Sequence, residues 1–359
     1  MSGEGASFLG RHARALVASL ALVVGFLLVM RAGALPVLPP AGVLAQTTGW
    51  LVAVFLVAML SSMLLKYARL YFLLKPIAQI PMRRLMSISC IAMALITLLP
   101  FRVGEIARPA MLREKGKVSG WALTATVAAE RIIDGIVFGV ALLAGLALAP
   151  AHQPVPDHIG ALPVPAALVP RAAVTATAMF GVLMVTMSLF YWRRDLAHLV
   201  THRVLGVVSR RLAETVAGIV ERSGEGLHFL SDVRHAGPYA AVTLLSVAAN
   251  VWAVQVLAAA VGLPRLDFAQ AAVVLGILAI GFALPNAPGF FGVVQLALYA
   301  GLALYVPAEM LTREGAAFVF LYYVSYLAVV FILALLGLLV EYVSTHSPGA
   351  QRLEAERGP

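Results

Sequence analysis

Two short stretches place charged side chains inside an otherwise apolar sequence, three residues in each. They are Arg102, Glu105 and Arg108 in the first stretch and Glu130, Arg131 and Asp134 in the second. Spacings of three and four residues put such side chains on one face of a helix. Guanidinium groups bind phosphate bidentately. The two stretches therefore predict a phosphate site, in which carboxylates hold the arginines or meet an ammonium or sugar hydroxyl.

A closed ion-pair network is the alternative interpretation of the same residues. Each ionised group costs about 2.5–3.5 kcal/mol at the middle of a membrane, so the second stretch must face protein or a hydrated cavity. A buried network that only joins one segment to its neighbour satisfies that requirement too. Glu105 and Arg108 also suit a position at the cytoplasmic interface. The residue types leave these alternatives open.

Composition identifies the class of protein that must position these groups. Of 359 residues, 61% are hydrophobic and 12% are charged, whereas a soluble domain carries about 25% charged residues. The mean hydropathy of +0.93 excludes a soluble globular or disordered chain. One cysteine, Cys90, excludes an internal disulfide. His198 and His202 lack a third ligand, so we expect no metal, and no motif indicates a cofactor.

Nine apolar runs predict the fold. They occupy residues 15–35, 48–65, 85–100, 119–150, 172–192, 238–262, 268–284, 290–306 and 316–341. A membrane-spanning helix needs about 20 apolar residues. We therefore expect an all-α, polytopic integral membrane protein with about seven or eight transmembrane helices plus broken or re-entrant segments.

The positions of lysine and arginine predict the orientation. Connections 36–47 and 151–170 contain neither residue, whereas 66–84 and 101–118 contain five each and 193–237 contains seven. Basic connections stay in the cytoplasm. Both termini of this multi-pass protein are therefore expected in the cytoplasm, and the net charge of +9 is mainly an orientation signal.

Two apolar runs are interrupted in opposite senses. The run 86–100 is short and lies between basic connections, so we expect it to enter from the cytoplasm and return there. The run 268–306 is broken by two prolines and two glycines within 285–292, and its flanking loops are expected outside. Opposed broken segments are typical of an inverted-repeat transport fold. Ordinary packing kinks at membrane prolines are the alternative.

The predicted organisation is one membrane domain, residues 1–345, followed by a cytoplasmic tail, 346–359. Its first half covers about 15–192 and its second half 238–341. The connection 193–237 has helical spacing of apolar residues between charges, which predicts an amphipathic helix on the cytoplasmic leaflet.

The motifs resemble those of a known family. Pro100–Arg108, Glu130–Asp134 and Pro288–Gly292 are similar to serial motifs of the lysylphosphatidylglycerol synthase transmembrane region, a flippase-like domain family, over about residues 10–345. The resemblance implicates the following residues in substrate binding: Arg102, Gly104, Glu105, Arg108, Glu130, Arg131, Asp134, Pro288, Gly289, Gly292 and Gln295. Phe290 stands where the family usually has glycine, and Gln295 where it has glutamate. Tyr322 and Tyr323 stand where relatives often carry a basic residue.

The resemblance also implies a function. It predicts a flippase without catalytic residues that moves a phospholipid or lipid-linked precursor across the cytoplasmic membrane, with a lipid synthase or glycosyltransferase as possible partner. Only 18 residues follow Glu341, so we expect no synthase domain. An accessory subunit of a lipid-modifying or glycan-assembly enzyme is the first alternative. A membrane transferase that uses Glu130 or Asp134 as a base is the second.

Overall fold

A computed structural model describes residues 21, 23–32, 35–99, 104–113, 120–151, 158–159, 161–163, 168–192, 232–283 and 287–346. The helices are α2 (Gly49–Ala68), α3 (Leu70–Leu74), α4 (Met82–Leu98), α5 (Ala107–Leu112), α6 (Gly120–Leu148), α7 (Leu168–Trp192), α10 (Val233–Ala260), α11 (Phe268–Ala283), α12 (Val293–Leu302), α13 (Ala308–Leu311) and α14 (Glu314–His346). The described residues also form two 3₁₀ turns, η1 (Leu44–Gln46) and η4 (Pro288–Phe290), and a two-residue antiparallel ladder, β1 (His158–Ile159) with β2 (Leu162–Pro163).

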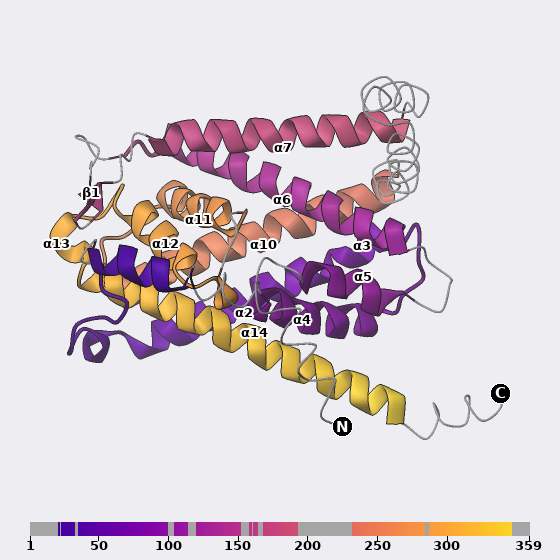
Figure 1. Cartoon of the computed structure of the whole chain (residues 1–359), viewed down its shortest axis with the longest axis horizontal. Coiled ribbons are helices and arrows are strands. Elements are labelled where there is room, and N and C mark those ends of the chain that lie inside the picture. The colour runs from indigo at the N-terminus through magenta and orange to yellow at the C-terminus, as the bar shows by residue number, and fades with distance from the viewer. Residues whose placement is uncertain are drawn as a thin grey trace.

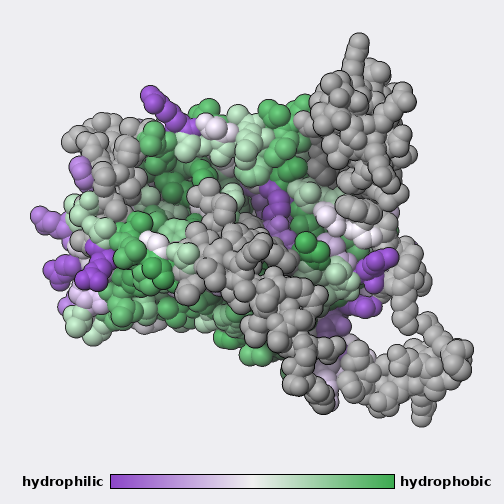
Figure 2. Space-filling view, viewed as in Figure 1, coloured by the Kyte–Doolittle hydropathy of each residue, from purple (hydrophilic) through white to green (hydrophobic). Residues whose placement is uncertain are grey.

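The predicted polytopic, helical membrane fold is confirmed. Five helices of the described part are long and apolar enough to cross a membrane: Gly49–Leu74, Ala122–Leu148, Leu168–Val185, Val233–Ala260 and Ala308–Ser344. Shorter apolar helices are Val23–Ala32, Phe268–Ala283 and Pro288–Leu302. In Figure 2 most of the middle of the described surface is green, and most purple residues lie toward the two ends. Such an apolar belt suits a lipid environment.

A connection without lysine or arginine and a connection rich in them lie at opposite ends of the helix bundle. Helix α13 and strand β1 lie at one end, and α3, α5 and the C-terminal end of α14 lie toward the other (Figure 1). The first end includes β1 and β2, from a connection without lysine or arginine. The second includes Lys75, Arg83 and Arg84. The two kinds of connection therefore lie at opposite ends of the bundle, and which end faces the cytoplasm stays a prediction. Residues 193–231 and 347–359, which include the predicted amphipathic helix and tail, lie outside the described residues.

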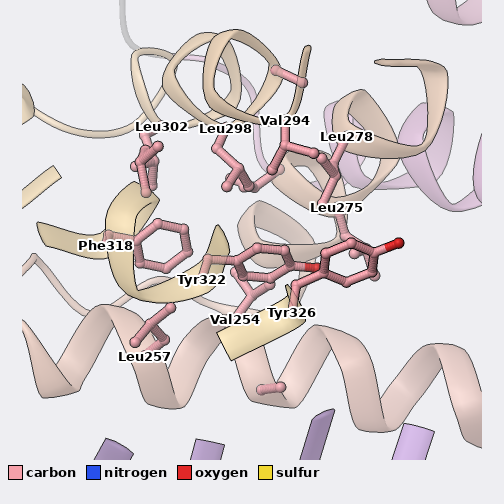
Figure 3. Packing of buried hydrophobic residues seen from close by; sticks show 14 of the residues in the cluster. Val254, Leu257, Leu275, Leu278, Val294, Leu298, Leu302, Phe318, Tyr322 and Tyr326 are labelled. Atoms are coloured by element: carbon pink, nitrogen blue, oxygen red, sulfur yellow. The ribbon is translucent and has the colours of Figure 1, made fainter. Parts of the chain in front are cut away.

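The core is made by α2, α10, α11, α12 and α14. Helices α2 and α10 pack antiparallel over most of their length, and the backbone N–H of Thr48 donates to Ala260 O while Ser62 Oγ donates to Ser246 O. Beside this pair, Phe318 and Tyr322 of α14 lie among leucines and valines of α10, α11 and α12 (Figure 3). The core places a rigid wall next to the charged residues.

The first broken element is a helix followed by a reversal of the chain. After α4 ends at Leu98, the backbone returns so closely that a Cβ on Gly104 would lie 2.3 Å from Ile96 N and 2.4 Å from the Leu95 carbonyl carbon. Helix α5 then packs on α4. Only glycine allows this approach, because it has no Cβ. The predicted return of this segment toward its own end is therefore present.

The second broken element is a hairpin of two short helices. Helices α11 and α12 pack together, with Gly281 against Ala297 and Gly301 against Val274. The turn η4 joins them, and η4 contacts α4. The two elements enter from opposite ends of the bundle (Figure 1), as predicted, and they meet inside it.

Candidate functional site

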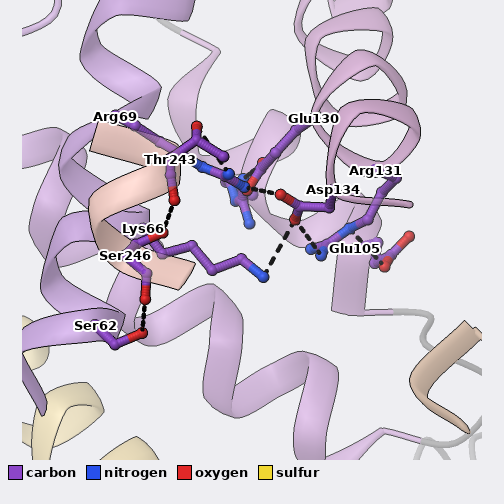
Figure 4. Close-up of polar contacts among 10 residues, drawn as sticks. Ser62, Lys66, Arg69, Glu105, Glu130, Arg131, Asp134, Thr243 and Ser246 are labelled. Carbon is purple, nitrogen blue, oxygen red and sulfur yellow. Dashed lines mark hydrogen bonds and ion pairs between the residues drawn. The ribbon is translucent and has the colours of Figure 1, made fainter. Parts of the chain in front are cut away.

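A buried ion-pair network joins α2, α5 and α6. Arg69 Nη2 lies 2.5 Å from Asp134 Oδ1 and 3.2 Å from Glu130 Oε1, and Arg108 Nη1 lies 2.5 Å from Glu130 Oε2. The side chains of Arg69, Glu130 and Arg108 are only 2–5% exposed. We call these three residues and Asp134 the inner network (Figure 4). Each of its charged groups pairs with at least one other member, as in the closed network considered from the sequence.

Helix α10 supports the inner network from the side. Arg69 Nη1 donates to Thr243 Oγ1 at 3.2 Å, and the hydroxyl of Thr243 donates to Tyr239 O at 2.7 Å. The Arg69 guanidinium also lies 5.4 Å from the centre of the Tyr239 ring, within the distance of a cation–π contact. Ion pairs, a hydrogen bond and a cation–π contact therefore hold this guanidinium in place, which leaves it little freedom to meet a ligand.

A second, more accessible set of charges lies beside the inner network. Lys66 Nζ is 3.2 Å from Asp134 Oδ2, and Arg131 Nε is 3.3 Å from Glu105 Oε1. These three side chains, Lys66, Glu105 and Arg131, are 35%, 26% and 25% exposed, and we call them the outer row. Their partial exposure distinguishes them from the inner network, since a ligand can reach them.

The outer row and Asp134 form the charged end of a cavity of about 440 Å³. Most other lining residues are apolar or aromatic, and they come from α2, α4, α6, α7, α11, η4 and α14. In Figure 2 a purple group lies in the middle of the green belt, next to α6. A cavity with charges at one end and apolar walls elsewhere matches an amphiphilic ligand. Lys66 and Arg131 balance Glu105 and Asp134 in formal charge.

Aromatic rings close the cavity where the two broken elements meet. The Phe290 ring lies 4.9 Å from that of Phe282, in edge-to-face orientation, and 6.3 Å from that of Tyr326. Tyr326 Oη lies 3.4 Å from Thr97 Oγ1 of α4. The chain holds Phe290 at a φ of 55°, a conformation that is strained for an aromatic residue. Contacts with two other rings offset this strain.

The other Pro-Gly residues have packing and capping roles. Gly289 and Gly292 have φ angles of 73° and 85°, and a Cβ on Gly292 would lie 2.1 Å from the Phe26 ring. Gln295 Oε1 accepts a hydrogen bond from Gly292 N–H at 2.7 Å, which caps α12. Pro288, Gly289, Gly292 and Gln295 are not among the residues that line the cavity. They shape the turn that presents Phe290.

The structure brings together most of the charged residues predicted from the sequence. Glu105, Arg108, Glu130, Arg131 and Asp134 form one cluster, whereas Gly104 packs on α4. Arg102 lies outside the described residues.

Lys66 and Arg69 were missed as site residues, because they were counted with a basic connection. The apolar run Leu70–Leu74 that follows them was the available signal, since it extends the apolar segment beyond the charged pair to Leu74. Charges enclosed in this way within an apolar segment are candidates for function.

The comparison with known families agrees with a helical membrane fold. The family model described as "Lysylphosphatidylglycerol synthase TM region" matches residues 16–334, and the chain therefore belongs to this family of membrane proteins. No curated protein and no solved structure matched the chain.

Proposed function

We propose that this protein translocates a phospholipid or a lipid-linked precursor across the cytoplasmic membrane, with both termini in the cytoplasm and without catalytic chemistry. The observation that carries the proposal is the cavity with a charged end and apolar walls between two opposed broken elements. Transporters of inverted-repeat type bind their substrates between such elements, near the middle of the membrane.

The two sets of charges take different parts in the proposed cycle. The inner network holds α2, α5 and α6 together and positions Asp134, which also pairs with Lys66. The outer row meets the head group: Lys66 and Arg131 attract its phosphate, and Glu105 accepts any ammonium or hydroxyl that it carries. The acyl chains remain along the apolar walls or in the membrane.

In the proposed cycle, the cavity opens to the other side of the membrane when η4 separates from α4. In the described conformation Phe290 and Tyr326 fill the space between η4 and α4. Movement of the α11–α12 hairpin away from α4 would break these ring contacts and extend the cavity toward the end that contains α13. The proposed cycle alternates between these two arrangements.

Translocation by the purified protein in liposomes tests the proposal. NBD-labelled phosphatidylglycerol in the inner leaflet is protected from dithionite unless it is moved outward. We expect wild-type protein to remove this protection and Arg131→Ala to restore most of it, because the variant lacks an accessible phosphate ligand. Arg313→Ala is the matched control, since Arg313 is 63% exposed and lies outside the cavity.

Equal translocation by wild-type protein and Arg131→Ala would remove Arg131 from the site. Absence of translocation by the wild type, for both phospholipids and polyprenyl-linked precursors, would instead favour the accessory-subunit role. In that case the protein should co-purify with a lipid-modifying or glycan-assembly enzyme.

A further inference from the structure

Asn250 is a polar residue in the cavity that the charged cluster does not use. It lies on α10 and lines the cavity together with Ser62 of α2 and Leu275 of α11. Its side-chain oxygen Oδ1 is buried and has no hydrogen-bond partner among the described residues. Buried polar atoms in proteins are nearly always paired, so each exception needs a ligand, an ordered water or another explanation.

Three other polar residues of α10 have hydrogen-bond partners. Thr243 and Ser246 donate to carbonyl oxygens one turn earlier, at 2.7 and 2.8 Å, and Gln255 Nε2 donates to Leu266 O at 3.0 Å. Asn250 therefore differs from these three residues, because it lines the cavity and its side-chain oxygen is unpaired. An apolar residue at this position would avoid the cost of burying that oxygen, which indicates that the amide serves a bound molecule.

The register of α2 and α10 gives the depth of Asn250 relative to the outer row. The hydrogen bond from Ser62 Oγ to Ser246 O places these two residues at the same level. Asn250 lies four residues beyond Ser246, and Lys66 lies four residues from Ser62 in the opposite direction along the antiparallel pair. Eight residues at a rise of 1.5 Å separate the two levels by about 12 Å. A side chain and a head group together can bridge this distance.

We infer that Asn250 Oδ1 accepts a hydrogen bond from a hydroxyl or ammonium group of a phospholipid head group whose phosphate lies at Lys66 and Arg131. This inference rests on lipid binding as proposed above and narrows the substrate class. The cavity selects phospholipids that carry a hydrogen-bond donor beyond the phosphate. A phosphodiester of the same charge without such a donor leaves Oδ1 unpaired.

A pair of lipids that differ only in this donor tests the inference. Phosphatidylglycerol and phosphatidylpropanol carry the same charge and the same chains, but the second lacks the head-group hydroxyls. The readout is the concentration dependence of the thermal-unfolding midpoint of the full chain in detergent with each lipid added. We expect phosphatidylglycerol to bind about threefold to tenfold more tightly to wild-type protein, the effect of one net hydrogen bond.

The variant Asn250→Leu separates a binding role from a structural one. Without lipid, we expect its unfolding midpoint to equal or exceed that of wild type, because the unpaired oxygen is gone. With lipid, we expect the preference for phosphatidylglycerol over phosphatidylpropanol to fall about threefold to tenfold, because the hydrogen bond to Asn250 is lost while Glu105 remains. Gln255→Leu is the matched control on the same helix. It leaves Leu266 O without its donor, so it should lower the midpoint and keep the lipid preference.

Two results would overturn the inference: equal binding of both lipids by wild-type protein, or an unchanged preference in Asn250→Leu. The second result would indicate that an ordered water, not the lipid, occupies Oδ1. Failure of translocation with an intact preference would count against the proposed function alone. Loss of the preference with intact translocation would count against the role of Asn250 alone.

Discussion

The guanidinium of Arg69, the residue between α2 and α3, lies 2.5 Å from a carboxylate oxygen of Asp134 on α6, and both side chains are largely buried. This pair joins the end of α2, which packs on α10, to α6, which packs on α11 and α7. Lys66 and Arg131 contact the other Asp134 oxygen. Asp134 is therefore the residue at which the inner network and the outer row meet.

Removal of Arg69 should destabilise the fold more than removal of Lys66. Arg69→Leu removes the buried counter-ion of Asp134 Oδ1 and Glu130 Oε1, and breaking a buried pair in this way costs about 3–5 kcal/mol. Lys66→Met removes a charge that is 35% exposed, so its effect on stability should be small while lipid binding weakens. Thermal unfolding and lipid binding of both variants in detergent measure the two effects. Equal destabilisation would contradict the division between the two sets.

The charge balance at the cavity should control the preference for anionic lipids. Glu105→Gln removes one carboxylate from the outer row while leaving a polar side chain of similar size next to Arg131. We expect tighter binding of phosphatidylglycerol and a steeper loss of affinity with added salt, because screening acts on the unbalanced cation. Glu314→Gln, at the end of the bundle away from the cavity, should change neither quantity.

Gly104 should not tolerate a side chain. In Gly104→Ala the new Cβ would overlap backbone atoms of Leu95 and Ile96, which cannot rotate away as a flexible side chain does. We expect a loss of about 1–3 kcal/mol, typical of overpacking, and a displaced α5 that weakens the Arg108–Glu130 pair. Gly120→Ala is the control, because a Cβ there meets nothing within 4 Å. An unchanged free energy of unfolding in Gly104→Ala would contradict the close approach of Gly104 to Leu95 and Ile96.

Two substitutions of Phe290 separate backbone strain from ring size. Phe290→Ala and Phe290→Gly both remove the ring that contacts Phe282 and Tyr326. Only glycine adopts a φ of 55° without strain, so Phe290→Gly should be more stable than Phe290→Ala by about 1 kcal/mol. Comparison of unfolding midpoints tests this, and the reverse order would contradict the positive φ. Both variants should enlarge the cavity at the tips.

The sequence predicted the classes of segment well because membrane helices depend on composition over about 20 residues, which is a local property. The interrupted elements were also predictable, since proline and glycine in 285–292 and two basic flanks around 86–100 are local signals. The contact between η4 and α4 was not predictable, because it depends on packing between residues that are far apart in the chain.

The candidate site was predicted in part for a similar reason. Glu130, Arg131 and Asp134 stand out because charge inside a long apolar run is costly. Arg69 lies near the end of such a run, where sequence alone does not distinguish an interfacial arginine from a buried one. Its 1% exposure results from Thr243 and Tyr239 on α10, far along the chain. Asn250 carries no charge, so nothing local marked it.

In the proposed cycle, the contact between η4 and α4 is the barrier between the two sides of the protein. Each broken element enters from its own end and stops inside the bundle, so a passage would form by separation of η4 from α4, without movement of a complete helix. The ring contacts of Phe290 with Phe282 and Tyr326 would then also limit the leakage of small ions between the two faces.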